Sequence, residues 1–153
     1  MVIDDIITYL QNKISNDEIF KDAKVLETYT YGHKVKSTEV QVMFTEHSEF
    51  ERFTTFDGIE ASVCPLLINI YATQTTYEQT VNEETVTVTL SAQRASYLLA
   101  QKIVGWLDSA TLASNINDVL SATKARFLPG VPFDVGTLLY QSVVRANLHV
   151  KNI

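Results

Sequence analysis

Three histidines are the first candidates for metal binding or general acid–base chemistry. His47 lies in an acidic stretch beside Glu46, Glu49 and Glu51, and a carboxylate-rich metal site would use such side chains. The other two histidines are far away in sequence, and no H-x-x-E or other paired-ligand spacing occurs. The acids also lack the alternating Asp/Asn spacing of an EF-hand calcium loop. We therefore expect a solvated acidic loop here, with no metal ion and no cofactor.

The sequence also contains no recognisable motif for nucleophilic catalysis. The chain contains no G-x-S-x-G elbow, and its five glycines form no phosphate-binding loop. The single cysteine, Cys64, lies in an apolar run before Pro65 and has no basic neighbour or histidine nearby. This setting is typical of a small buried side chain and not of a reactive thiol. We predict no catalytic residues and no enzyme activity.

Seven tyrosines suggest stacking against nucleic-acid bases, but stacking platforms need a basic groove beside them. Tyr29, Tyr31, Tyr71 and Tyr77 instead lie among threonines and acids in expected strands, where tyrosine favours packing or a protein interface. The formal net charge of −6, with few and scattered basic residues, argues against binding to nucleic acid or to anionic lipid. The amino-terminal "MVIDDIITYLQNKI" carries acids where a signal peptide needs bases, and its apolar residues are interrupted. It predicts neither a signal peptide nor a membrane span.

The elements that position these side chains follow from hydrophobic periodicity. The chain has 153 residues, of which 46% are hydrophobic and 20% are charged, which predicts a single domain over 1–153. A helical spacing of apolar residues predicts a helix at 2–14 and a second one at 91–109 with Ser91 as its N-cap. The segment "TLASNINDVLSATK" predicts a shorter helix that includes Val119 and Leu120.

Strands are expected from alternating or continuous apolar residues. They cover residues 25–31, 40–45, the run "VCPLLINIYATQTTY" and 138–150. The run is apolar on both alternating faces, which predicts a central strand covered on both sides. The segment "ETVTVTL" is expected to pair with this strand across "TQTTYEQTVNE", and "RFLPGVPFDVG" is expected to be a loop. The order predicts an α+β fold: a single mainly antiparallel or mixed β-sheet flanked by two or three helices.

This arrangement resembles the tail terminator and tail completion (head–tail joining) proteins of tailed bacteriophages. The resemblance covers nearly the whole chain and rests on a short amphipathic first helix, a strand-rich middle, the helix "AQRASYLLAQKIVGWLD", a proline-bearing connection and a last strand ending in "SVVRANLHV". It implies a structural virion protein, in the tail or neck, that is assembled in the host cytoplasm. The implied partners are further copies of the chain in a ring, typically of six, a tail-tube protein, and the head–tail connector or a neck protein. DNA would only pass through the channel, and no membrane is involved.

Three segments are the expected interaction surfaces: the acidic segment 46–60, the proline-bearing segment with "LPGVPF", and the last strand as it approaches Ile153. The acidic segment 46–60 carries spaced phenylalanines, "DG" within it is a turn candidate, and it is expected to be a long loop or an extended hairpin. We expect it to be mobile in the free subunit and either to become ordered in an assembly or to line the channel of the assembly. The proline-bearing segment adds apolar side chains that can pack on the domain or grip a neighbour. Another phage neck or minor capsid component, or a soluble protein- or ligand-binding domain, remains an alternative. The candidate interface residues are Glu46, Glu49, Phe50, Glu51, Phe53, Phe56, Phe127, Leu128, Val131 and Phe133.

Overall fold

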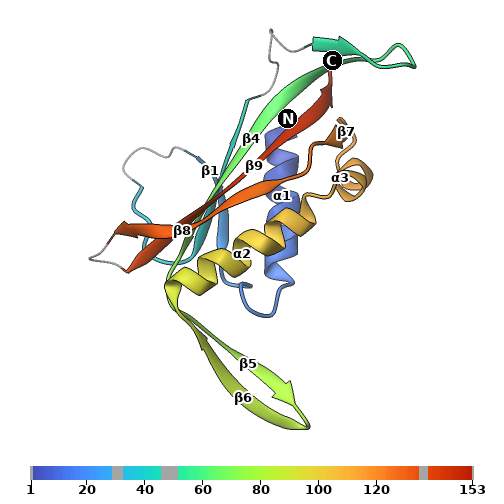
Figure 1. The fold of residues 1–153 in the computed structure, drawn as a ribbon. Coiled ribbons are helices and arrows are strands. Elements are labelled where there is room, and N and C mark those ends of the chain that lie inside the picture. Colours follow the sequence, from blue (N-terminus) through green and yellow to red (C-terminus); the bar gives the residue numbers. More distant parts are fainter. Residues whose placement is uncertain (1, 29–32, 46–51, 135–137, 153) are drawn as a thin grey trace.

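The computed structural model describes residues 2–28, 33–45, 52–134 and 138–152 (Figure 1). Within these ranges the chain forms three helices and nine strands. In chain order they are α1 (Val2–Ser15), β1 (Lys24–Glu27), β2 (Glu39–Phe44), β3 (Arg52–Thr54), β4 (Glu60–Ala72), β5 (Thr75–Val81), β6 (Glu84–Leu90), α2 (Ala92–Trp106), α3 (Ser109–Asn115), β7 (Val119–Ala122), β8 (Arg126–Asp134) and β9 (Leu139–Lys151).

The main sheet is built around the two long strands β4 and β9, which are antiparallel and 13 residues each. Its order is β1-β2-β4-β9-β7, with β3 added beside the start of β4 and β8 added beside the first part of β9. Only β1 and β2 are parallel among the described pairs. The predicted α+β fold with a mixed, mostly antiparallel sheet and flanking helices is confirmed.

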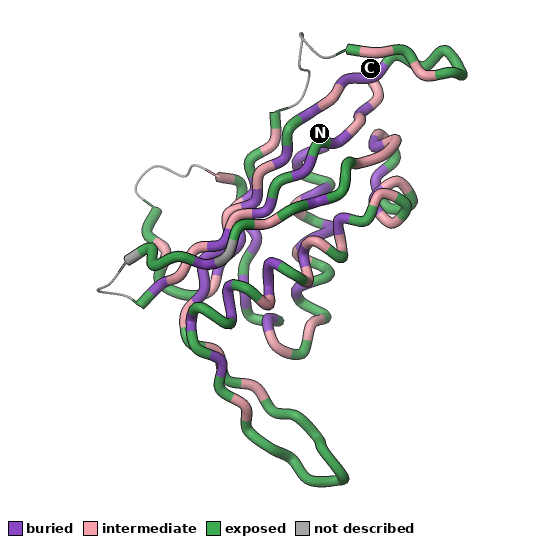
Figure 2. The backbone as a smooth tube through the Cα atoms, in the orientation of Figure 1, coloured by how far each residue is buried: buried purple, intermediate pink, exposed green. Residues whose placement is uncertain are grey.

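One face of the sheet forms the core. Leu66, Ile68 and Ile70 of β4 are buried, as are Val144 and Leu148 of β9. The alternate side chains of both strands are mostly half-buried or exposed, because the three helices lie on the same side of the sheet (Figures 1 and 2). The prediction that β4 is central is confirmed by its neighbours β2 and β9. The prediction that it is covered on both sides is wrong, since its second face is covered only in part.

Both long helices begin and pack as their sequences predict. The side-chain oxygen of Ser91 accepts a hydrogen bond from the backbone N–H of Arg94, which caps α2. Leu99 and Ile103 are fully buried against the sheet, whereas Trp106 is only half-buried. Burial of this apolar stripe holds the helix in place, because an isolated helix of this length is marginal in water.

The proline-bearing segment is a strand and not the predicted loop. β8 pairs with β9 on one side only, with register shifts after Leu128 and after Pro132. An edge strand with bulges tolerates proline, because the missing N–H need not reach a second neighbour. Similarly, Val119 and Leu120 were expected in a helix, but α3 ends at Asn115 and both residues lie in β7. Pairing with β9 overrides the local helical pattern there.

Two further strand predictions need correction. The segment 84–90 does not pair with β4; it pairs with β5, which the intervening residues themselves form. The two strands make a separate hairpin that projects from the body beyond the amino end of α2 (Figure 1). Of the first predicted strand, 25–31, the residues up to Glu27 lie in β1 and Thr28 lies outside it, whereas 29–31 lie outside the described residues.

Candidate interaction surface

The closest arrangement to a catalytic pair is a serine–histidine contact that sequence reasoning missed. Ser121 Oγ lies 2.6 Å from His149 Nδ1, across the β7–β9 ladder. The ring of Phe53 meets the His149 ring edge-on at 5.3 Å between centroids. A hydrolytic triad needs a carboxylate on the second ring nitrogen, and the part of the chain that the structure describes places none there. The contact instead joins β7 to β9 where the register of their pairing shifts.

A second polar cluster lies at the start of β2. Both carboxylate oxygens of Glu39 lie within 2.9 Å of His33 Nε2, and Gln41 Nε2 donates to Glu39 at 2.7 Å. Tyr71 stands opposite Glu39 in the ladder, and burial, followed by the nearby Glu39 charge, raises the pKa of its phenol. These contacts satisfy a carboxylate that is only 7% exposed. The cluster is therefore explained by the need of a buried carboxylate for hydrogen-bond partners.

No group of three or more potential metal-ligating side chains occurs among the described residues. Within the same ranges, no helix is long and apolar enough to cross a membrane. Cys64 is buried, as predicted.

The open face of the sheet carries exposed apolar side chains. Met43 on β2 and Leu128 on β8 are 46% and 58% exposed. Between them stand Leu67 of β4 and Val143 of β9. Together with their neighbours these side chains line a hollow of about 800 Å³. Exposed apolar side chains gathered in one place are typical of a contact surface.

Basic side chains rim this hollow, which we call the open-face groove. Lys124, Arg126 and Arg145 all line it. Arg126 and Arg145 are paired directly opposite each other in neighbouring strands. No acidic residue is among the described lining residues. The groove is therefore an apolar floor with a positive rim on a chain whose net charge is −6.

The β5–β6 hairpin is the second unusual surface. Most of its residues are exposed, including Val81 and Val86, each 45% exposed (Figure 2). Its root is anchored, because Leu90 is buried and leads directly into the N-cap of α2. Tyr77 packs on the margin of the core. Within the described part of the chain, the tip half has no comparable packing.

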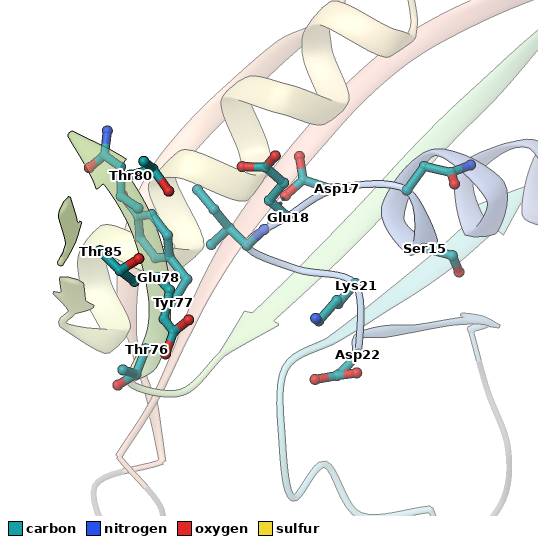
Figure 3. A pocket seen from close by; sticks show the side chains of 13 residues that line it. Ser15, Asp17, Glu18, Lys21, Asp22, Thr76, Tyr77, Glu78, Thr80 and Thr85 are labelled. Atoms are coloured by element: carbon teal, nitrogen blue, oxygen red, sulfur yellow. Dashed lines mark hydrogen bonds between the residues drawn. The ribbon is translucent and has the colours of Figure 1, made fainter. Parts of the chain in front are cut away.

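A polar hollow of about 1030 Å³ separates the hairpin from the loop after α1 (Figure 3). Asp17, Glu18 and Asp22 line it from the loop, and Glu78 lines it from β5. Asp17 is held in place by the Lys102 ammonium at 2.6 Å. Apart from Tyr77 and Ile19, the described residues that line this hollow are polar, so the rest of the hairpin gains no apolar packing there.

The predicted interface residues divide into three groups. The first group lies outside the described residues and comprises Glu46, Glu49, Phe50 and Glu51, together with the neighbouring His47. Of the predicted segment 46–60, the structure describes only the part from Arg52 onward. There, β3 and the start of β4 form a hairpin whose turn contains Gly58 at φ +82°, which matches the predicted "DG" turn. Phe56 at this turn is fully exposed.

Phe53 is half-buried against His149, and Phe127 is half-buried against the Tyr97 ring at 5.3 Å. These two phenylalanines therefore pack mainly within the subunit. Three residues of β8 are exposed: Leu128, Val131 and Phe133 at 58%, 57% and 51%.

Sequence reasoning missed both the arginine pair and the hairpin. The arginines are brought together only by the β8–β9 pairing, and β8 was not expected to be a strand. The hairpin carried a readable signal, since threonines, valines and a tyrosine flank the polar pair Asn82–Glu83. No protein-family model matches this chain, and no curated protein is significantly similar to it in sequence.

Proposed function

We propose that this protein is a structural subunit that works by self-association, as a tail terminator or a related head–tail joining protein of a tailed bacteriophage. The observation that carries the proposal is the presence, on one small subunit, of an open apolar groove and a separate projecting hairpin. Rings with cyclic symmetry need two different surfaces that meet between neighbours. The groove and the hairpin are two such surfaces.

The physical chemistry of the hairpin supports association. A two-stranded hairpin without further packing is marginally stable in water. β5 and β6 have seven residues each and are mostly exposed, so their own pairing is nearly all that holds the tip half. Contact with another molecule would remove Val81 and Val86 from water and would stabilise the hairpin.

The charge and the surface chemistry also suit a role without catalytic turnover. A ring of subunits with a net charge of −6 each would repel DNA that passes through its channel, which favours passage over adhesion. The proposed partners are further copies of the chain, the tail-tube protein and a neck or connector protein. The proposed location is the virion tail or neck.

Two measurements test this function. Light scattering coupled to gel filtration, together with negative-stain microscopy, should detect rings whose fraction rises with protein concentration. Phage particles that lack the protein should have tails of uncontrolled length or tails that fail to join heads. A chain that stays monomeric even with its tail-tube and neck partners present would refute the proposal, as would normal tails and head attachment in its absence.

A soluble binding domain for a protein partner is the second candidate. The open-face groove favours it, because an extended peptide with apolar and acidic side chains would fit its floor and rim. This function predicts a monomer at every concentration and one-to-one binding of a partner. The same scattering measurement therefore separates the two candidates.

A further inference from the structure

Among the described residues, no counter-charge pairs with the two arginines of the open-face groove. Arg126 and Arg145 stand directly opposite each other on antiparallel strands, an arrangement that is unfavourable for like charges. Both are exposed, and neither has an ion-pair partner within the described part of the chain. Three of the twelve lysines and arginines of the chain line this one groove. The groove is therefore suited to an occupant that brings carboxylates.

The floor of the groove indicates the other chemical and geometric properties that its occupant should have. Pairing across the sheet places Met43, Leu67, Arg145 and Arg126 in one row. The occupant should therefore present apolar side chains next to its carboxylates, in a shape narrow enough to lie along strands. Extended segments have this shape.

The tip of the β5–β6 hairpin has this chemistry. Residues 75–90 contain three glutamates and no lysine or arginine. Glu83 and Glu84 lie at the tip, next to the exposed Val81, and Val86 follows on β6. Acid and apolar side chains thus occur together at the end that projects farthest from the body (Figure 1).

The backbone of the turn adds an independent indication. Val81 pairs with Glu84, and the two turn residues Asn82 and Glu83 have φ values of 51° and 67°. Two-residue turns of this kind favour Asn followed by Gly, because a side chain at the second position is strained. A glutamate there places a carboxylate at the tip at a conformational cost. Strained backbone positions cluster at functional sites such as ligand clamps and switch regions.

We infer that the hairpin tip of one subunit docks in the open-face groove of the next copy, with Glu83 and Glu84 facing Arg126 and Arg145, and Val81 on the apolar floor. The inference rests on the proposed self-association and names its two surfaces. A seven-residue strand reaches roughly 24 Å from its root, which is enough to cross to a neighbour. The contact is head-to-tail, which is the kind of contact from which cyclic rings are built when the rotation between neighbours closes.

The same subunit cannot supply this contact. The root of the hairpin is fixed on both sides, by the N-cap of α2 after β6 and by a hydrogen bond from Thr73 N–H to Thr38 Oγ1 before β5. From this root the hairpin points away from the main sheet (Figure 1). A second copy is therefore the occupant.

Two double charge reversals test the contact. The groove variant Arg126→Glu/Arg145→Glu and the hairpin variant Glu83→Lys/Glu84→Lys should each lose the ring at a concentration where the wild type is fully assembled. Circular dichroism and the urea midpoint should show that both remain folded. The matched control Lys34→Glu/Lys36→Glu, at exposed positions outside the groove, should assemble like the wild type.

An equimolar mixture of the groove and hairpin variants is the decisive experiment. Each reversed groove can accept a reversed hairpin, and each original groove can accept an original hairpin. The mixture should therefore recover rings in which the two variants alternate, which native mass spectrometry can count. Wild-type rings should also dissociate more readily between 0.1 M and 1 M salt, since the Debye length falls from about 10 Å to about 3 Å.

The outcomes separate this inference from the proposed function. If both variants form rings like the wild type, or if their mixture stays monomeric, the docking inference is wrong while ring formation by the wild type still supports the function. If the groove variant forms rings but no longer binds the tail-tube protein, the groove has a different occupant and the inference is also wrong. If the wild type itself never assembles, both proposals fail together.

Discussion

Substitution of Gly130 tests how closely β8 packs against α2. Gly130 lies in β8 at the bulge, is buried beside α2, and its φ is not in the left-handed region. A Cβ at this position would overlap Ser96 Oγ and would approach Ser142 Oγ at 3.3 Å. Both hydroxyls are fully buried and hydrogen-bonded: Ser142 Oγ donates to Ser96 Oγ at 3.2 Å, and Ser96 Oγ donates to the Gln93 carbonyl at 2.9 Å. The Gly130→Ala variant must therefore displace groups that already have partners.

The balance of effects predicts a loss of stability. Overpacking a filled site costs about 1–3 kcal/mol, and disturbing the hydroxyl contact costs about 1 kcal/mol more. In the opposite direction, alanine lowers the conformational entropy of the unfolded chain, which stabilises the folded protein by about 0.4–1 kcal/mol. We expect a net loss of about 1–3 kcal/mol. With a urea slope of about 2 kcal/mol per M, the unfolding midpoint should fall by roughly 0.5–1.5 M.

Equilibrium unfolding in urea, followed by circular dichroism, measures this shift. Protein concentration must be fixed, because assembly would make the apparent stability depend on it. Gly105→Ala is the matched control, since no heavy atom lies within 4 Å of its added Cβ and the position is helical. That variant should gain about 0.5–1 kcal/mol from helix propensity.

The double variant Ser96→Ala/Gly130→Ala should be more stable than Gly130→Ala alone, because the crowded oxygen is gone. A Gly130→Ala midpoint at or above that of the wild type would refute the reasoning. No recovery in the double variant would show that the crowding has another source.

Four other changes have expected outcomes. Gly58→Ala should cost about 1 kcal/mol in urea unfolding although its surroundings are open, because its φ of +82° strains any side chain. Leu99→Ala should cost about 2–5 kcal/mol, since the side chain is fully buried, and an unchanged midpoint would remove α2 from the core. Asp17→Ala should lower the free energy of unfolding by about 2 kcal/mol, because the Asp17 carboxylate accepts hydrogen bonds from the N–H groups of Ile19 and Phe20 and pairs with the Lys102 ammonium at 2.6 Å. A decrease of less than about 0.5 kcal/mol, which is usual for a surface substitution, would contradict this. Burial, and secondarily the Asp108 charge, raises the pKa of Tyr9, whose hydroxyl donates to the Trp106 carbonyl at 2.6 Å. Because the folded state holds this proton more tightly than the unfolded state, the contribution of Tyr9 to stability should be level below about pH 10 and should fall as pH rises above it. Tyr9→Phe should weaken that fall, and an unchanged pH profile would show that another group causes it.

Several elements were predictable because their signals are local. The helical spacing in α1 and α2 and the N-cap at Ser91 need no knowledge of the rest of the chain. The apolar runs of β2 and β4 and the burial of Cys64 follow from side-chain chemistry in the same way. Each of these features was confirmed.

Other features depend on partners that are distant in sequence. Proline and glycine in β8 are loop signals, but β9 supplies a ladder and the free edge tolerates the missing N–H groups. The short apolar run at Val119 and Leu120 fits a helix or a strand equally well, and pairing with β9 decides it. Neither outcome can be read from the local residues.

The amino-acid sequence by itself determined the fold class, the two long helices, the central strand and the acidic charge of the chain, because periodicity and composition are properties of the covalent order. Only the tertiary structure decided which surfaces remain open. It placed all three helices on one side of the sheet, and it brought Arg126 opposite Arg145. It also set Glu83 at the end of a hairpin that its own subunit does not cover. These arrangements arise from the register of paired strands, which depends on contacts between segments far apart in the chain.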